Sequence, residues 1–231
     1  MIRITSLFLT LFLMGCEADR NAALITHITF DEVDGRKAKD VSGRGHHAVS
    51  ERLALGNGVH GKALSLDGTA ASVLELRDVG DLISAADDIT ISLWAYRENE
   101  GNTALTVHNY PAMFLGFHGP QFKWQLRYGN GRGASCYADR TYEAKLNRWY
   151  HIAATFDGWR ARLFVDGVEI CSDWTRGGAI DIVDKPARLG GYEDPEKGLI
   201  DLMRGRLDDV RIYDAALSAS QIEALAALPS R

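Results

Sequence analysis

The clearest pattern along this chain is the alternation of apolar and polar side chains in short runs. Residues 89–96 carry an apolar side chain at every second position from Ile89 onward, and residues 121–128 repeat the pattern from Phe122 onward. A repeat of two is that of a β-strand that packs one face on a core. Both runs are therefore predicted to be strands of a sheet with one apolar face.

Three more runs, at 149–156, 161–165 and 168–170, follow one another closely and are separated by Asp-Gly pairs. Glycine readily adopts the positive φ that tight hairpin turns require, so these pairs favour hairpins. The segment is predicted to be a three-stranded meander whose register is fixed by its two turns.

The first ninety residues contain several short strand patterns and no convincing helical one. A strand that includes Phe30 is predicted to stop at the turn-rich residues 31–35, and residues 40–45 are again dense in turn formers. A further strand at 61–68 ends in an Asp-Gly pair, and residues 73–76 are its expected hairpin partner.

The chain ends as a strand, a short link and a short amphipathic helix. Residues 207–213 form the strand pattern, and Ser218 with Gln221 has the spacing of a capping box. Pro229 is expected to end the helix. Many short strands with one helix predict an all-β fold, a two-sheet antiparallel jelly-roll sandwich with one short C-terminal helix. We expect a single domain over residues 24–228.

The N-terminus has the pattern of an export signal. An apolar run at 4–14 follows Arg3 and is shorter than the about 20 residues that span a membrane, so residues 1–15 are predicted to be a signal peptide. Residues 13–16, which end in Gly15 and Cys16, resemble the lipobox of bacterial lipoproteins. The resemblance implies that Cys16 is lipidated, that residues 16–23 are a tether, and that the exported protein contacts the bacterial membrane only through this anchor. Glu17 favours the outer membrane or the surface; an ordinary secretory signal is the alternative.

The overall composition is that of a globular domain. The 231 residues are 46% hydrophobic and 25% charged, with a net charge of -5. Nucleic-acid binding usually needs a concentrated basic face. No run of like charge provides one, so no nucleic-acid partner is expected.

Two cysteines, Cys136 and Cys171, lie in strand-like stretches of the predicted domain. An exported protein meets an oxidising compartment, so the pair is predicted to form one disulfide. Closing a loop of a few dozen residues would stabilise the fold by roughly 3 to 4 kcal/mol on the chain-entropy account. Two free buried thiols are the alternative.

Several motifs together carry a family resemblance. Residues 149–158, 163–167 and 205–218, with earlier matches at 61–68 and 89–94, look like successive motifs of laminin-G-like jelly rolls in the concanavalin-A-like lectin and glucanase superfamily. The resemblance spans about residues 24–228 and implies the same jelly-roll fold. It implies little about function, because this fold hosts lectins, adhesion modules, hydrolases and lyases.

The resemblance also implies a structural calcium ion where the first strand meets the last. Matching motifs indicate Asp31 and Asp208 as ligands, with Asp40 or carbonyls of residues 40–45 nearby. Asp208 and Asp209 should point to opposite faces of a strand, unless a bulge intervenes. The alternative is that these carboxylates cap turns and form ion pairs.

No catalytic group is predicted. Hydrolases of the superfamily present Glu-x-Asp-x-x-Glu on one strand; Glu32 and Asp34 begin that spacing, but Lys37 occupies the third position. His151 lies alone on a strand and is expected to be structural rather than a general base. The chain is therefore expected not to be an enzyme.

Ligand binding is the leading hypothesis. Trp159 and Trp174 lie in or near turns, where an exposed ring offers a stacking surface, and Tyr110 and Arg132 lie in loops that would line the same rim. We expect a non-catalytic, lipid-anchored envelope or surface module that binds a carbohydrate or a protein partner. A polysaccharide-degrading enzyme with an unfamiliar site and a structural component of an envelope assembly are the alternatives.

Overall fold

The computed structural model describes residues 22–77, 79, 83, 87–100, 105–107, 113–181 and 186–227. Its main sheet follows one antiparallel path that folds back on itself, so two layers enclose a core. The first layer has the order β14-β13-β12-β7-β18-β1, and the second has the order β11-β10-β9-β8-β15-β6-β3, with β2 joining β3 to β1.

The first layer is built around the closing strand β18, which pairs with β7 along one side. Its other side pairs with β5 and then with β1. The strands of this layer are β1 (Leu24–Asp34), β4 (Ala54–Asn57), β5 (Lys62–Asp67), β7 (Ile89–Arg97), β12 (Trp149–Phe156), β13 (Arg160–Val165), β14 (Val168–Trp174) and β18 (Arg204–Tyr213).

The second layer and the covering elements complete the described fold. The second layer and its linking strand consist of β2 (Lys37–Asp40), β3 (Ala48–Ser50), β6 (Leu74–Leu76), β8 (Leu105–Val107), β9 (Met113–His118), β10 (Gln121–Tyr128), β11 (Arg132–Tyr137) and β15 (Ala187–Leu189). The covering elements are the 3₁₀ turn η1 (Ala70–Ser72), the hairpin strands β16 (Tyr192–Asp194) and β17 (Gly198–Ile200), and the helix α2 (Ala219–Ala226).

The core lies between the apolar faces that the alternating patterns predicted. Trp124 of β10 is fully buried. Phe122 of the same strand meets Tyr150 of β12 with ring centroids 5.1 Å apart, and Tyr128 meets Phe156 at 5.8 Å. The predicted strands at 89–96 and 121–128, and the all-β jelly-roll class, are therefore confirmed.

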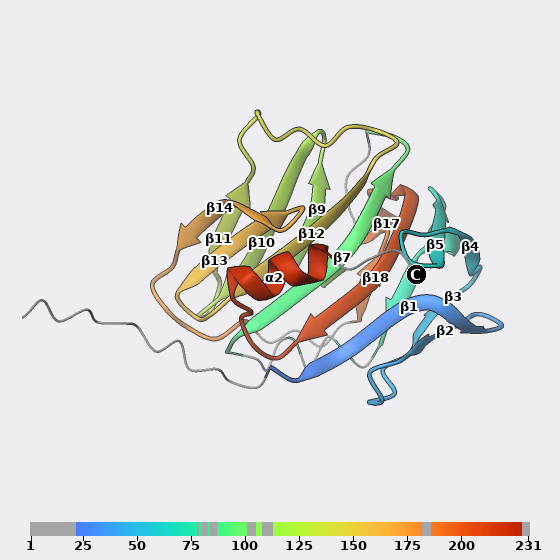
Figure 1. The fold of residues 1–231 in the computed structure, drawn as a ribbon, viewed down its shortest axis with the longest axis horizontal. Coiled ribbons are helices and arrows are strands. Elements are labelled where there is room, and N and C mark those ends of the chain that lie inside the picture. Colours follow the sequence, from blue (N-terminus) through green and yellow to red (C-terminus); the bar gives the residue numbers. More distant parts are fainter. Residues whose placement is uncertain are drawn as a thin grey trace, which may run out of the picture.

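The helix α2 lies across the outer face of the first layer, in front of its central strands (Figure 1). Its buried Ile222 packs against Ala153 and Phe164. The Ser218 side chain accepts the backbone N–H of Gln221, and the Gln221 side chain accepts the N–H of Ser218, which confirms the predicted capping box. The helix also contacts the turn before β14, where Gly167 lies against Glu223 and Ala226.

Two predicted boundaries in the first half were wrong. Residues 67 and 68 do not make a hairpin to 73–76, because Asp67 accepts the N–H and hydroxyl of Thr69 and starts η1. As a result β5 pairs with β4 and β18, whereas β6 joins the second layer. The first strand also continues past Phe30 to Asp34, where it pairs with β2 after an irregularity in register.

A disulfide joins Cys136 of β11 to Cys171 of β14, as expected. It closes a sequence separation of 35 residues and ties the edge strands of the two layers together. The predicted signal peptide, Cys16 and most of the tether lie outside the described residues. Within the part of the chain that the structure describes, no helix is long and apolar enough to cross a membrane.

Candidate functional site

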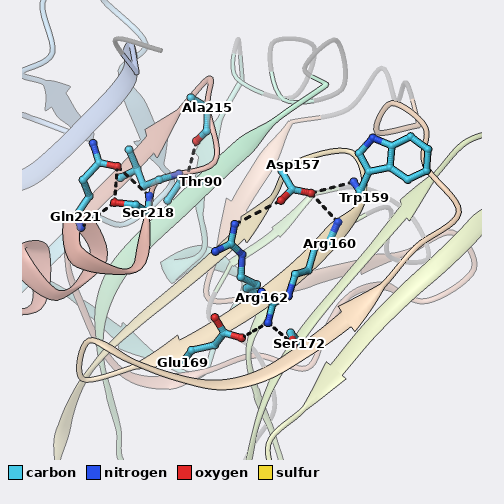
Figure 2. A network of polar contacts seen from close by, with 11 residues as sticks. Thr90, Asp157, Trp159, Arg160, Arg162, Glu169, Ser172, Ala215, Ser218 and Gln221 are labelled. Atoms are coloured by element: carbon cyan, nitrogen blue, oxygen red, sulfur yellow. Dashed lines mark hydrogen bonds and ion pairs between the residues drawn. The ribbon is translucent and has the colours of Figure 1, made fainter. Parts of the chain in front are cut away.

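The turn between β12 and β13 presents Trp159 at the surface. Asp157 fixes this turn, because its carboxylate accepts the backbone N–H of Trp159 at 2.9 Å and of Arg160 at 2.6 Å. Arg162 reaches the other oxygen of Asp157 at 3.4 Å. Figure 2 shows the indole pointing away from this network, and Trp159 is 62% exposed.

The second predicted tryptophan, Trp174, ends β14 directly across from Arg160. The guanidinium of Arg160 lies 5.2 Å from the ring centroid of Trp174. Glu169 and Ser172 accept from the same guanidinium at 2.7 and 2.9 Å, as Figure 2 shows. Trp174 is 72% exposed. Its ring therefore contacts the guanidinium of Arg160, whose charge Glu169 balances, and remains largely in solvent.

Two glycines bring the Trp159 turn against the turn between β10 and β11. A Cβ at Gly177 would lie 2.8 Å from the indole of Trp159, and the φ of Gly177 is +78°, so a side chain there would displace the ring. A Cβ at Gly178 would lie 3.0 Å from the Cα of Gly129. The backbone after β14 therefore lies between Trp159 and the β10–β11 turn.

Arg132 belongs to the same end of the molecule. It is exposed, and its Nη1 is 3.7 Å from the position of a Cβ on Gly129. Thr175, next to Trp174, donates its N–H to the carbonyl of Trp159 at 2.7 Å. The structure thus gathers three of the four predicted ligand residues; Tyr110 lies outside the described residues. We call Trp159, Trp174, Arg132 and Gly177 the Trp159 rim.

A second polar group lies near the middle of β18, where Asp208 and Asp209 meet aromatic residues that the sequence pattern did not connect to them. The φ of Asp209 is +50°, and the pairing of β18 with β7 shifts between Asp208 and Arg211, so a β-bulge intervenes. Both carboxylates are buried, while Leu207 and Val210 beside them face the core. The available signal was the broken alternation at 207–210, where two acidic residues separate two apolar ones.

Asp209 has two side-chain partners, His27 and the cation Arg211. His27 lies 2.6 Å from its carboxylate and Arg211 lies 2.9 Å from the same oxygen. Burial opposes ionisation of Asp209, but the hydrogen bond with His27 and the charge of Arg211 outweigh it, so the pKa of Asp209 is lowered. Asp209 is therefore an ionised structural group that joins β18 to β1.

Asp208 lies in a different environment, around the ring of Trp94. Burial raises the pKa of Asp208 to about 7, although the backbone N–H of His60 donates to its carboxylate at 2.9 Å. The ring of Trp94 is 6.0 Å from that of His60 and 5.3 Å from that of His151. We call Asp208, Asp209, His60, Trp94 and His151 the bulge cluster.

His151 is enclosed by the first layer beside Ser92. Its Nε2 is 2.8 Å from the hydroxyl of Ser92, the residue is 1% exposed, and burial lowers its pKa to about 4. One polar atom on each of four residues in the bulge cluster is buried and has no hydrogen-bond partner among the described residues. These atoms are Asp208 Oδ1, His60 Nε2, Trp94 Nε1 and His151 Nδ1. The ring of His151 is therefore buried and neutral, with no described carboxylate bound to its Nδ1.

The three predicted calcium ligands do not come together as a complete set. Asp31 and Asp208 hold the same loop, because Asp31 accepts the N–H of Lys62 at 2.8 Å and Asp208 accepts that of His60. Asp40 instead accepts backbone N–H groups of residues 27, 42 and 46. Within the described residues, no group of three or more His, Cys, Asp or Glu side chains is placed to hold a metal. Loop carbonyls would have to complete any site at Asp31 and Asp208.

A cavity of about 430 Å³ lies apart from both regions, on the outer side of the second layer. Lys37, Val49, Glu75 and Leu199 are among its lining residues. Its walls carry charges of both signs, and its lining includes no aromatic residue. It therefore lacks the stacking surface that the Trp159 rim offers.

Comparisons with known proteins agree with this architecture. A sequence profile described as the concanavalin A-like lectin/glucanases superfamily matches residues 67–223. The binding domain of Paraclostridial Mosquitocidal Protein 1 is similar at 20% identity with a TM-score of 0.71, over 88% of this chain and 52% of that one. The binding domain of botulinum neurotoxin serotype G gives 16% identity and a TM-score of 0.68, over 88% and 50%.

A third similar structure is a whole small domain. Domain 4 of AbnA, a GH43 extracellular arabinanase from Geobacillus stearothermophilus, was solved in complex with arabinotriose. It shares 23% identity and a TM-score of 0.62, over 89% of this chain and 98% of that one. The chain thus spans about half the length of the two toxin binding domains and nearly all of the arabinanase domain. No curated protein sequence matches the chain.

Proposed function

Because this chain belongs to the concanavalin A-like lectin/glucanases superfamily, we propose that it is a non-catalytic binding module that recognises a carbohydrate or a protein partner through the Trp159 rim. The single observation that carries the proposal is the presentation of Trp159. A 62% exposed indole is fixed by the Asp157 turn and by Gly177, so binding would not have to order it.

The similar structures support a binding role over catalysis. Two are the binding domains of toxins, and one is an arabinanase domain solved with arabinotriose. Carbohydrate is the preferred ligand class, because a flat exposed indole suits the apolar face of a sugar ring. A protein partner remains the alternative that the binding test distinguishes.

The test is a screen of the purified protein against a glycan panel, with product detection on the same samples. Saturable binding without turnover is expected, and Trp159→Ala should weaken it at least tenfold. Tyr142→Ala is the matched control, since this exposed aromatic follows β11 at the end opposite Arg132. Turnover of any glycan, or binding unaffected by Trp159→Ala, would contradict the proposal.

Lipid anchoring through Cys16 and export to the bacterial envelope, at the outer membrane or surface, are also part of the proposal. They rest on the resemblance of residues 13–16 to a lipobox. Labelled palmitate should enter the full chain expressed in bacteria, and Cys16→Ala should remove both the label and the protein from the membrane fraction. Equal labelling of the two chains would show that Cys16 is not the anchor.

A structural calcium ion held by Asp31 and Asp208 is the last part of the proposal. Asp208 Oδ1 has no partner among the described residues and is available as a ligand, whereas Asp40 is occupied by backbone N–H groups. A bound ion stabilises the native state, so added Ca²⁺ should raise the Tm and a chelator should lower it. An unchanged Tm in both conditions would rule the ion out.

A further inference from the structure

Two exposed arginines at the Trp159 rim have no ion-pair partner among the described residues. Arg132 opens β11, and Arg176 precedes Gly177, over which the Trp159 ring lies. The backbone N–H of Arg176 donates to the hydroxyl of Tyr128 at 3.3 Å, and Tyr128 is the strand partner of Arg132. Both guanidinium groups are therefore carried by backbone that is fixed close to Trp159.

Three described carboxylates on the segments around these arginines have other partners. Asp181 accepts the backbone N–H of Asn130 at 2.8 Å and of Gly131 at 2.7 Å. Asp173 accepts the N–H of Ser135 at 3.2 Å. Asp157 accepts two backbone N–H groups and is paired with Arg162. These acids fix the loops, and no ion pair joins them to Arg132 or Arg176.

This arrangement contrasts with two arginines of the neighbouring strand β13. Arg160 is paired with Glu169, and Arg162 with Asp157, so their charges are compensated within the protein. The whole chain is acidic, with a net charge of -5, so positive charge that has no ion-pair partner among the described residues is a local feature of the rim. An aromatic platform flanked by two guanidinium groups without a described ion-pair partner suits a ligand that has both a flat apolar face and a negative charge.

We propose that the Trp159 rim binds an acidic polysaccharide whose sugar rings carry carboxylates, with Trp159 stacking on a ring and Arg132 and Arg176 pairing with uronate groups. A guanidinium presents a planar fork of N–H donors that matches a carboxylate in two parallel hydrogen bonds. The inference rests on the proposed function, because it names the ligand class of the same rim.

The experiment titrates the purified protein with hexamers of galacturonic and mannuronic acid and with the methyl esters of the same hexamers. Esterification removes each charge while keeping the sugar ring. At least one acidic hexamer should bind at least tenfold more tightly than its ester, and raising the salt concentration should weaken that difference. Neutral arabinose and galactose oligomers are titrated in parallel.

Variants of the protein separate the contribution of the arginine charges from that of the Trp159 ring. Arg132→Gln and Arg176→Gln should each weaken acidic-hexamer binding about fivefold and leave ester binding unchanged, whereas Trp159→Ala should weaken both. Arg44→Gln is the matched control: it also removes one exposed arginine, but it lies in the loop hydrogen-bonded to β1, at the other edge of the first layer.

The outcomes are distinguishable. Equal binding of acid and ester, or unchanged affinity in both arginine variants, would contradict the proposal that the ligand is acidic. The proposal that the Trp159 rim binds a ligand would be unaffected. Binding of a neutral oligomer in preference to both acidic hexamers does the same. Failure of every glycan to bind overturns the ligand class proposed here together with carbohydrate recognition itself.

Discussion

The Trp159 rim and the bulge cluster both bring aromatic and charged side chains together, but they differ in what surrounds them. At the rim, acids such as Asp157 and Asp181 bind backbone N–H groups and leave Trp159 in solvent. In the bulge cluster, Asp208 and His151 are almost completely buried and each leaves one polar atom without a described partner.

The difference indicates which polar group serves recognition and which serves the fold. An exposed side chain that is already held in place loses little entropy when a ligand binds, so its interaction energy is available for affinity. A buried polar group instead raises the cost of folding unless it is paired. The rim should therefore affect binding without affecting stability, and the bulge cluster should do the reverse.

Among changes at the rim, the largest expected effect on stability comes from the disulfide, which connects the strands on which the rim is built. Cys136 lies in β11 with Arg132, and Cys171 lies in β14 with Trp174. Replacing both cysteines with alanine should lower the free energy of unfolding by about 3 to 4 kcal/mol, on the chain-entropy account for this loop. Urea denaturation measures the loss. A loss below about 1 kcal/mol would mean that the bond does not constrain the unfolded chain.

The second prediction concerns the charge at the bulge. Asp209→Asn keeps a residue type that tolerates the positive φ at this position, but removes the charge that pairs with His27 and Arg211. Leaving Arg211 partly buried without its anionic partner should cost about 2 to 3 kcal/mol. Asp214→Asn is the exposed control and should change stability by less than about 1 kcal/mol, because its described contact is a hydrogen bond from Ala23 N–H.

These two regions also show what the sequence pattern can and cannot reveal. The Asp-Gly turns and the alternating runs predicted the β12–β13–β14 meander and its core face, because turn chemistry and strand period are local. Trp159 and Trp174 were identified for the same reason. Their nearness to Arg132 depends on the contact of Gly178 with Gly129, across a long sequence separation, which no local pattern encodes.

The bulge cluster was harder to predict for a related reason. Trp94 and His151 face each other in the pairing of β7 with β12, and His60 reaches Trp94 from the loop before β5, which pairs with β18. The hairpin predicted at Asp67 did not form for the same reason. The carboxylate of Asp67 accepts the backbone N–H of Thr69, and β5 pairs with the distant strand β18. Long-range pairing decided both outcomes.

The third prediction uses pH to separate the two buried groups of the bulge cluster. The pKa of Asp208 is raised by burial from 3.8 to about 7, so its contribution to stability is complete below about pH 4 and is lost as the pH rises through about 7. The pKa of His151 is lowered by burial from 6.5 to about 4, so its contribution is complete above about pH 6.5 and is lost as the pH falls through about 4.

The two contributions therefore oppose each other between about pH 4.5 and 6.5. In Asp208→Asn the free energy of unfolding should rise by about 2 kcal/mol over this range, and in His151→Gln it should fall by about the same amount. The wild-type protein should change little. Urea denaturation at each pH measures all three, and groups common to them cancel in the comparison. If the free energy of unfolding depended on pH equally in the two variants, the pKa shifts assigned to Asp208 and His151 would be wrong.

The smallest expected change in stability distinguishes two tryptophans of this chain. Trp159→Ala should alter the free energy of unfolding by less than about 0.5 kcal/mol, because the side chain is 62% exposed. Trp124→Ala removes a fully buried ring between the layers and should cost about 3 to 5 kcal/mol. If Trp159→Ala destabilised the fold as strongly, the ring would be holding the turns together and its exposure would not indicate a ligand. A stable Trp159→Ala protein that no longer binds glycan assigns the indole to recognition alone.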